Sequence, residues 1–267
     1  MARPRSADIT AGGDTLPQER QQWIVQRLRS HGRVVAAELA AEFEVSEDSI
    51  RRDLRELAAQ GLCKRVYGGA LPLPPGGTPL KQRRHEDTAR KQTLARKAVT
   101  LVRRGQILLI DAGSTNAAIA EALPERFGLT VITNAPDIAQ VLMEREGFDI
   151  LLIGGRVDQR TGATMGAQAL LEIQRIRADL CFPGACAIDA ETGLWGFESE
   201  ETLLKRAMIE ACGETVVVVT DGKLGTVANH RAAGVQDVQH LVVEHDAEPS
   251  LVNAFIARGV AVHRADA

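Results

Sequence analysis

The sequence of 267 residues predicts an α/β protein with a small, mostly helical N-terminal domain and a larger α/β domain. Three observations predict this. Apolar residues recur at helical spacing up to about residue 60. Residues 71–79 then combine four prolines with two glycines. From residue 106 onward, short β-branched runs alternate with helical stretches. The length exceeds the usual size of one domain, so each part can bury its own core.

The first 45 residues of the helical part predict two helices and a turn. Residues 18–29 form the first helix, with Ile24 and Leu28 directed inward, and residues 35–43 form the second, with Leu39 and Ala40 directed inward. A short turn at residues 44–45 follows. Two helices joined by a tight turn to a third are typical of a helix-turn-helix.

The third helix begins at Ser46, whose hydroxyl is suited to cap it, and carries acidic residues in its first turn. Ile50, Leu54 and Leu57 lie at i, i+4 and i+7 and predict one buried face. Arginines occupy another face, as a helix in a DNA groove requires. The alternative is a small helical domain whose arginines are merely solvated. The candidate DNA-binding residues are Ser46, Ser49, Arg51, Arg52, Arg55, Lys64 and Arg65.

Beyond this helix we expect Gly61 to end it and residues 62–69 to form a small hairpin, or wing. The wing would present Lys64 and Arg65 to phosphates of the DNA backbone. The sequence thereby predicts a winged helix-turn-helix over residues 17–71.

The formal net charge of −3 conceals a polarity along the chain. Residues 71–104 carry nine basic and two acidic groups, whereas residues 105–267 carry twelve basic and twenty-three acidic groups. The basic part can meet a polyanion while the acidic part is repelled by it. This distribution is compatible with DNA as a partner despite the acidic total.

The boundary between the two parts is a Pro/Gly-rich linker at residues 72–80, since residues 71–79 do not favour regular structure. Residues 81–104 then predict a basic helical segment with Leu94, Ala98, Leu101 and Val102 on its apolar side. This segment either docks on the following domain, which we favour, or reaches toward DNA. We expect residues 1–16 to be a disordered arm and residues 81–267 to form the second domain.

The second domain is predicted to contain a mostly parallel sheet covered by helices. Continuous apolar runs are typical of strands that are buried on both faces. The predicted strands are residues 107–110, 130–132, 150–153, 215–219 and 241–243, with helices at residues 117–123 and 136–146.

Polar loops follow four of these strands, and ligands of such sheets bind at the carboxyl ends of strands. Residues 111–116 place a glycine and hydroxyls before a helix N-terminus, which suits a phosphate, and Lys223 could meet the same anion. The loop matches neither the P-loop nor the dinucleotide fingerprint. A capped helix start is the alternative explanation. The candidate effector-binding residues are Asp111, Gly113, Ser114, Thr115, Asn116, Thr133, Asn134, Gly154, Gly155 and Lys223.

These motifs resemble the DeoR family of bacterial transcription regulators. In the first domain the resemblance lies in Ser46, residues 49–54, Leu57, residues 61–62, Arg65 and residues 68–70. In the second it lies in residues 111–115, 133–134, 154–155 and 221–223. The resemblance implies a sensor domain similar in fold to ribose-5-phosphate isomerase and glucosamine-6-phosphate deaminase. It further implies a cytoplasmic repressor of a carbohydrate-metabolism operon, released from double-stranded operator DNA by a phosphorylated sugar.

Some positions depart from the family pattern. Ala187 stands where glycine is usual, and the segment Asp221-Gly222-Lys223 is one residue short. Trp195 and Phe197 introduce bulky rings that are either core or pocket residues. The existence of a pocket is therefore better founded than the identity of its effector.

An active sugar-phosphate isomerase or deaminase with an attached DNA-binding domain is the alternative function. Such an enzyme needs a carboxylate base in the pocket. Asp189 stands near the expected place, and Glu198, Glu200 and Glu201 are possible bases, although a solvated helix start explains these glutamates equally well. We expect no catalytic residue.

Other classes of protein are disfavoured by the composition. The four cysteines lack the Cys-x-x-Cys spacing, so we expect reduced thiols and no metal site. We expect no cofactor, no membrane span and no signal peptide. Because one winged helix contacts little DNA, we expect a homodimer or homotetramer.

Overall fold

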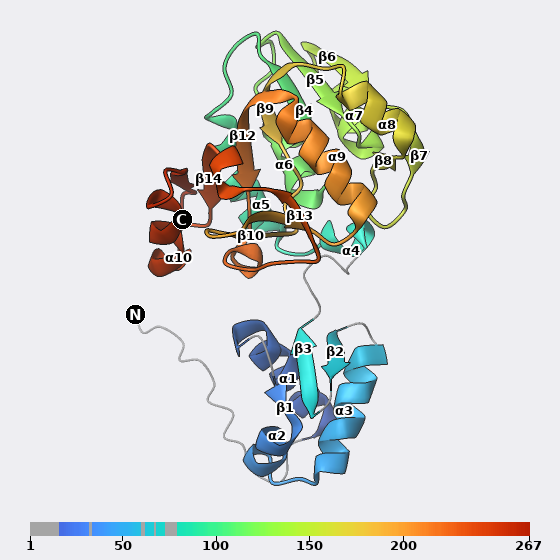
Figure 1. Ribbon diagram of the computed structural model, residues 1–267, viewed down its shortest axis with the longest axis vertical. Helices are drawn as coiled ribbons and strands as arrows, with labels where there is room; N and C mark the ends of the chain where they lie inside the picture. The colour runs from blue at the N-terminus through green and yellow to red at the C-terminus, as the bar shows by residue number, and fades with distance from the viewer. Residues whose placement is uncertain (1–15, 32–33, 60–61, 67, 73–78) are drawn as a thin grey trace. The chain divides into compact units, whose positions relative to one another are not determined.

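The computed structural model describes residues 16–31, 34–59, 62–66, 68–72 and 79–267 (Figure 1). The chain divides into two compact units, residues 1–77 and 78–267, and each is described by itself. Among the described residues, no helix has the length and apolar character needed to cross a membrane.

The first unit is a winged helix-turn-helix. Its helices are α1 (Pro17–His31), α2 (Ala36–Glu42) and α3 (Glu47–Ala59). Its antiparallel sheet has the order β1 (Val34–Val35), β3 (Gly69–Pro72) and β2 (Cys63–Val66). The inward positions expected from the sequence are buried together in one core with Phe43; they are Ile24, Leu28, Leu39, Ala40, Ile50, Leu54 and Leu57.

The structure differs from the expectation at the end of the wing. Pro72 belongs to β3, where it pairs with Cys63, so the irregular segment does not begin at residue 71. A proline is tolerated there because the strand ends at this residue. Strand β1 was not predicted, since two residues give no periodic signal. Gly61, residues 1–15 of the arm expected at residues 1–16, and the linker residues 73–78 lie outside the described residues.

A buried ion pair joins the first helix to the third. Arg20 Nε donates to Asp53 Oδ2 at 2.6 Å, and both side chains are almost fully buried. Gln21 Nε2 donates to the other carboxylate oxygen at 3.2 Å. The Asp53 carboxylate therefore fixes α3 against α1, on the side of α3 away from solvent.

The second unit is built on a parallel sheet of seven strands in the order β15-β14-β12-β9-β4-β5-β6. The strands are β4 (Ile107–Ile110), β5 (Leu129–Thr133), β6 (Phe148–Leu152), β9 (Ala178–Phe182), β12 (Cys212–Val218), β14 (His240–Val243) and β15 (Ala261–Arg264). The five predicted strands are confirmed, and the α/β class with them. Strands β9 and β15 were not predicted.

Helices cover both faces of this sheet, which gives three layers. On one face, α5 (Thr88–Val99), α6 (Ser114–Ala122) and α7 (Pro136–Met143) share a core with Leu108, Ile110 and Val131. On the other, α8 (Ala167–Ile173), α9 (Ser199–Glu210) and α10 (Pro249–Ile256) share a core with Leu109 and Ile132. Alternate strand residues thus enter opposite cores, as the pleat requires.

One predicted strand occupies a different position from the one expected. Strand β6 lies at the edge of the sheet, and Leu151 and Leu152 are 49% and 44% exposed. At the edge of a sheet, the helices that cover the faces need not extend over the last strand. An apolar run in the sequence therefore does not establish that the strand is buried on both faces.

The basic segment after the linker is two helices and not one. Helix α4 (Leu80–Arg83) ends before Asp87, whose φ of 50° is left-handed, and α5 begins at Thr88. Leu94, Ala98 and Val102 are buried in the core that α5 shares with α6 and α7. The apolar side of the segment therefore docks on the second unit, as we favoured.

Small elements complete the second unit. Strands β10 (Ala187–Asp189), β11 (Gly193–Gly196) and β13 (His230–Ala233) form an antiparallel sheet, and β7 (Arg156–Val157) pairs with β8 (Thr164–Met165). Two short 3-10 helices lie at Asp221–Lys223 and Val235–Asp237.

Candidate functional site

The start of α3 has the cap that the sequence predicts. Ser46 Oγ accepts a hydrogen bond from the backbone N–H of Ser49 at 3.2 Å and lies 3.0 Å from Ser49 Oγ. Both hydroxyls stand at the end of the helix where the dipole favours an anion.

The arginines of α3 are at the surface of the first unit. Arg51 pairs with Glu47 at 2.7 Å and with Asp48 at 3.4 Å, and its side chain is half exposed. Arg52 and Arg55 are exposed on the same helix, and Arg65 is exposed on β2. The side chain of Lys64 lies outside the described residues. Exposed pairs of this kind contribute little to stability, so Arg51 can exchange its partners for phosphates or bases at small cost.

The second candidate site lies where the strand order of the large sheet reverses. The chain runs from β4 to β5 and β6 on one side, then returns to place β9 and β12 on the other. Loops leaving β4 and β9 diverge at this point, and ligands of parallel sheets bind in the crevice between such loops.

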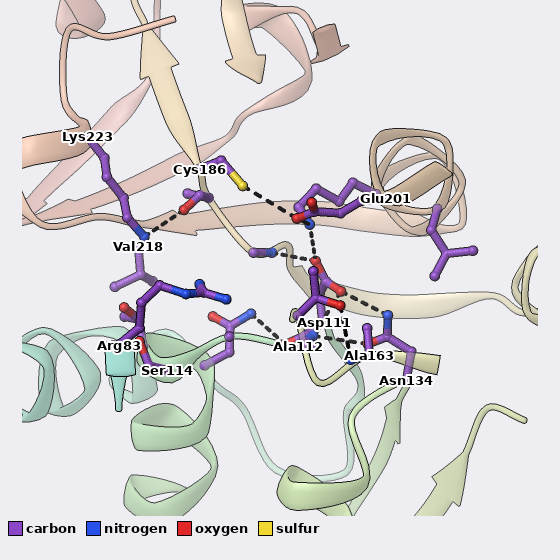
Figure 2. Close-up of a pocket in the computed structure, with 18 of the residues that line it drawn as sticks. Arg83, Asp111, Ala112, Ser114, Asn134, Ala163, Cys186, Glu201, Val218 and Lys223 are labelled. Carbon is purple, nitrogen blue, oxygen red and sulfur yellow. Dashed lines mark hydrogen bonds and ion pairs between the residues drawn. The ribbon is translucent and has the colours of Figure 1, made fainter. Parts of the chain in front are cut away.

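A cavity of about 30 Å³ occupies this position (Figure 2). It lies among the loops after β4, β5, β9 and β12, the end of α4, the first turns of α6 and α9, and the loop that precedes β8. The polar and charged residues that line it are Arg83, Asp111, Ser114, Thr115, Asn116, Asn134, Thr161, Glu201, Lys205 and Lys223.

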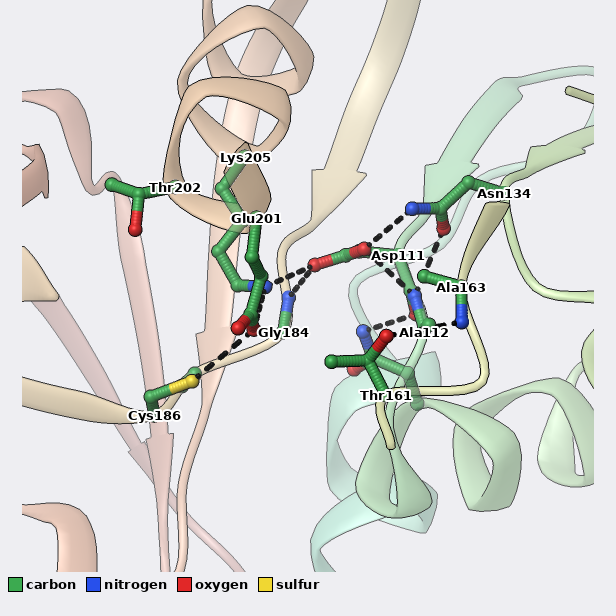
Figure 3. Close-up of polar contacts among 12 residues, drawn as sticks. Asp111, Ala112, Asn134, Thr161, Ala163, Gly184, Cys186, Glu201, Thr202 and Lys205 are labelled. Carbon is green, nitrogen blue, oxygen red and sulfur yellow. Dashed lines mark hydrogen bonds and ion pairs between the residues drawn. The ribbon is translucent and has the colours of Figure 1, made fainter. Parts of the chain in front are cut away.

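Asp111 is the centre of a hydrogen-bond network in this site (Figure 3). Its Oδ1 accepts from the N–H of Ala112 at 2.8 Å and from Asn134 Nδ2 at 3.0 Å. Its Oδ2 accepts from the N–H of Gly184 at 2.8 Å and lies 3.0 Å from Lys205 Nζ. A Cβ on Gly184 would come within 2.9 Å of Oδ2, so this approach requires glycine. Asp111 thus orients the surrounding loops.

Glu201 and Lys205 form a buried pair one turn apart on α9. Lys205 Nζ donates to Glu201 Oε1 at 2.7 Å. Burial disfavours both charges, but the Lys205 charge lowers the pKa of Glu201 to about 2, and Asp111 with Glu201 raises the pKa of Lys205. Both groups are therefore ionised at neutral pH.

Of the two explanations left open for the glutamates, a solvated helix start does not apply to Glu201. Glu198 and Glu200 are exposed, whereas Glu201 is buried. The i, i+4 spacing of Glu201 and Lys205 was a visible signal. It did not indicate burial, because surface helices use the same spacing. Lys205 was missed altogether as a site residue.

Lys223 reaches the cavity from the loop after β12. Its Nζ donates to the carbonyl oxygen of Ala185 at 2.8 Å. Burial lowers the pKa of Lys223 to about 8, so the group is mostly charged at neutral pH and is poorly solvated. Figure 2 shows Lys223, Arg83 and Ser114 on one side of the cavity and Glu201 and Asp111 on the other.

The structure does not bring every candidate residue to the cavity. Thr133 donates to the carbonyl of Ile110 at 2.6 Å, and the N–H of Gly154 donates to Glu172 at 3.2 Å. Neither they nor Gly155 line the cavity among the described residues. Asn116 lines it, but its amide is bonded to the carbonyls of Asp111 and Phe182. Strand-end position alone therefore does not decide which side chains face a ligand.

The aromatic residues past Asp189 lie in or next to β11, in the small sheet formed by β10, β11 and β13. Trp195 Nε1 donates to Thr192 Oγ1 at 3.0 Å, and Phe197 is buried. Asp189 accepts from Thr192 and Glu191 in the turn between β10 and β11. None of Asp189, Trp195 and Phe197 lines the cavity in the part of the chain that the structure describes.

Comparison with known proteins agrees with both units. Residues 20–73 match the DeoR-like helix-turn-helix domain, and residues 86–245 match the DeoR C-terminal sensor domain. The chain is 37% identical over 208 residues to the glycerol-3-phosphate regulon repressor of Escherichia coli K12, covering 78% of this chain and 82% of that protein. It is 32% identical over 249 residues to a putative aga operon transcriptional repressor of Escherichia coli O157:H7, covering 91% and 92%.

Among solved structures, ribose 5-phosphate isomerase A of Methanocaldococcus jannaschii is 20% identical with a TM-score of 0.37, over 52% of this chain and 55% of that one. The sorbitol operon regulator of Klebsiella pneumoniae is 10% identical with a TM-score of 0.41, over 91% and 100%. The two family matches together span most of the sequence, and the named relatives are transcriptional repressors and not enzymes. The chain belongs to the DeoR family of transcription regulators.

Proposed function

We propose that this chain represses an operon of carbohydrate metabolism and leaves its operator when a phosphorylated sugar or polyol occupies the cavity. The observation that carries the proposal is the cavity at the reversal of strand order. There the N-terminus of α6 and the Lys223 ammonium converge from different loops. Backbone N–H groups at a helix start and a poorly solvated ammonium together favour a phosphate. Relatives named for glycerol 3-phosphate and for the aga operon support the same class of effector.

We further propose that the protein acts as a homodimer or homotetramer in the cytoplasm, where its operator lies. A single winged helix contacts about one half-site, and specific affinity in the usual range requires two. The enzyme alternative gains no support, because both carboxylates at the cavity are already paired with Lys205.

The DNA side of the proposal is tested on α3. Arg51→Ala with Arg52→Ala should reduce operator affinity about a hundredfold, since each base-reading arginine contributes about 1–3 kcal/mol. Glu56→Ala, on the same helix, is the control and should leave the footprint intact. The measurement is a footprint on the region upstream of the protein's own operon, and an unchanged footprint in the double variant would contradict the assignment.

The effector side is tested at Lys223. Lys223→Ala should weaken the response of the operator complex to the phosphorylated compound by about tenfold or more, because a charge-assisted contact to phosphate is lost. Lys223→Arg should retain most of the response. Release of DNA at the wild-type effector concentration by the alanine variant would exclude Lys223 as the anchor.

The phosphate itself is tested by a screen of thermal stability. A phosphorylated sugar at about 100 times its dissociation constant should stabilise the second unit by about 2.7 kcal/mol. The unphosphorylated parent sugar should not stabilise the unit, because the N–H groups at the start of α6 and the Lys223 ammonium would remain hydrated. Equal shifts from both compounds would count against the site.

A further inference from the structure

One carboxylate oxygen at the cavity lacks a hydrogen-bond donor. Glu201 Oε1 accepts from Lys205 Nζ at 2.7 Å and from Cys186 Sγ at 3.4 Å. Glu201 Oε2 is buried and has no hydrogen-bond partner among the described residues. Arg160 Nη2 lies 3.6 Å away, within range of an ion pair but beyond a hydrogen bond.

Lys205 and Arg160 stabilise the ionised form of Glu201, but Oε2 still lacks the hydrogen-bond donor that a buried acceptor normally has. The missing hydrogen bond is a cost that the unliganded protein carries. Glu201 cannot turn away from the cavity without losing Lys205, which holds its other oxygen. A group inside the cavity that donates a hydrogen bond to Oε2 would remove this cost.

The cavity is also asymmetric in charge. Lys223, Arg83 and the start of α6 make one side suited to an anion (Figure 2). Asp111 and Glu201 lie on the opposite side with Lys205 between them (Figure 3). Asp111 already accepts from four donors, so Glu201 Oε2 is the carboxylate oxygen on that side left for a ligand.

We propose that Glu201 is a specificity-determining residue of the effector site: its Oε2 accepts a hydrogen bond from a hydroxyl or amino group of the effector on the side away from the phosphate. The inference rests on the proposed function and narrows it. The site takes phosphorylated polyols, sugars and amino sugars, and it rejects phosphorylated acids. A carboxylate at that end offers acceptors alone and would leave two anionic oxygens facing each other without a proton.

The test uses pairs of probes that differ at one carbon, where a hydroxymethyl group in one replaces a carboxylate in the other. The pairs are glycerol 3-phosphate with 3-phosphoglycerate, and glucitol 6-phosphate with 6-phosphogluconate. Affinity for the full-length protein is measured by calorimetric titration, and release from operator DNA by fluorescence anisotropy. For at least one pair, the wild-type protein should prefer the polyol by about tenfold or more.

Glu201→Gln should change that preference in a defined direction. Lys205 and Cys186 donate to Oε1, so the amide oxygen will take that position and the amide NH₂ will take the place of Oε2. An NH₂ group donates to a carboxylate, so the acid should gain about tenfold relative to the polyol. Glu200→Gln is the matched control. Glu200 precedes Glu201 on the same helix, is exposed and pairs with Arg156, and its replacement should leave the ratio unchanged.

The outcomes are distinct. Equal wild-type affinity for polyol and acid, or an unchanged ratio in Glu201→Gln, would overturn the inference and leave the proposed function standing. The ion pair with Arg160 would then be enough to balance Oε2. No binding of any phosphorylated probe to the wild-type protein would overturn the proposed function, and the inference with it. Operator affinity without effector and the circular dichroism spectrum establish that Glu201→Gln folds. A purely structural role for Glu201 would weaken both probes of a pair equally.

Discussion

The proposed contact between Lys223 and the effector phosphate should make effector binding depend on pH. Burial lowers the pKa of Lys223 to about 8, so it loses its proton above that pH, while a phosphate monoester carries its second charge above about pH 6. A phosphate binds the protonated lysine, so affinity is greatest between these two values. Above pH 8, Lys223 must take up a proton before it can bind the phosphate. The affinity for the effector should therefore fall about tenfold per pH unit.

Titration calorimetry with the tightest-binding phosphorylated sugar at pH 5 to 9.5 measures this profile. In Lys223→Arg the alkaline decrease should vanish, because arginine stays charged. The same affinity at pH 7 and pH 9 in the wild-type protein would refute the role given to Lys223.

Asp53 belongs to the stability of the DNA-binding unit and not to its contacts with DNA. Asp53→Ala removes the buried carboxylate that Arg20 Nε and Gln21 Nε2 contact, which should destabilise the unit by about 3–5 kcal/mol. Glu56→Ala removes an exposed carboxylate that also accepts from Gln21, and should cost less than about 1 kcal/mol. Urea unfolding followed by the fluorescence of Trp23 compares the two, and equal losses would contradict the burial argument.

At the scale of elements, α4 joins the linker to the wall of the cavity. The N–H of Leu80 donates to the carbonyl of Arg160 at 2.8 Å, and Leu80 is buried against Gly162. Arg83, at the other end of α4, lines the cavity. Lys91 donates to the carbonyls of Arg83 and Glu86 and so ties α4 to α5. We therefore expect a ligand that displaces Arg83 or the loop at residues 160–162 to displace α4 as well.

Gly162→Ala should loosen α4. The residue has φ of 75°, and a Cβ would lie 2.3 Å from Leu80 Cδ2, so the variant is strained and clashes. We expect a loss of about 1–3 kcal/mol in the second unit and faster hydrogen exchange over residues 80–91. Gly222→Ala is the control, because a Cβ there meets no atom within 4 Å and φ is not left-handed. Exchange that is equally slow in both variants would show that Leu80 does not hold the helix.

The elements that the sequence could predict are those with local signals. Ser46, the apolar face of α3 and the polar loop before α6 each arise from residues close in sequence. The burial of Asp53 beside Arg20, and of Lys205 beside Asp111, depends on residues far apart in sequence and on which face of a helix the rest of the chain covers. The edge position of β6 likewise depends on the order of strands, which no single strand specifies. Pairings over long sequence distance were therefore the part that sequence patterns could not give.

At the scale of the whole molecule, the two units have separate cores, and they match a DNA-binding domain and a sensor domain. Calorimetry of the full chain should show two unfolding transitions. An effector at about 100 times its dissociation constant should increase the free energy of unfolding of the second unit by about 2.7 kcal/mol and so raise its transition temperature. Operator DNA should raise the transition temperature of the first unit. One shared transition, moved equally by either ligand, would show instead that the two units unfold together.

The small size of the cavity has a consequence for the speed of the response. A volume of about 30 Å³ is far below the roughly 300–1,000 Å³ of pockets that enclose a small-molecule ligand. We therefore expect the walls to move apart before binding of a phosphorylated polyol is complete. In stopped-flow mixing, the observed rate should level off at high effector concentration, at the rate of opening. The time in which a cell carrying this regulator answers a change in its carbon supply would then be set by the motion of these walls and not by diffusion of the metabolite.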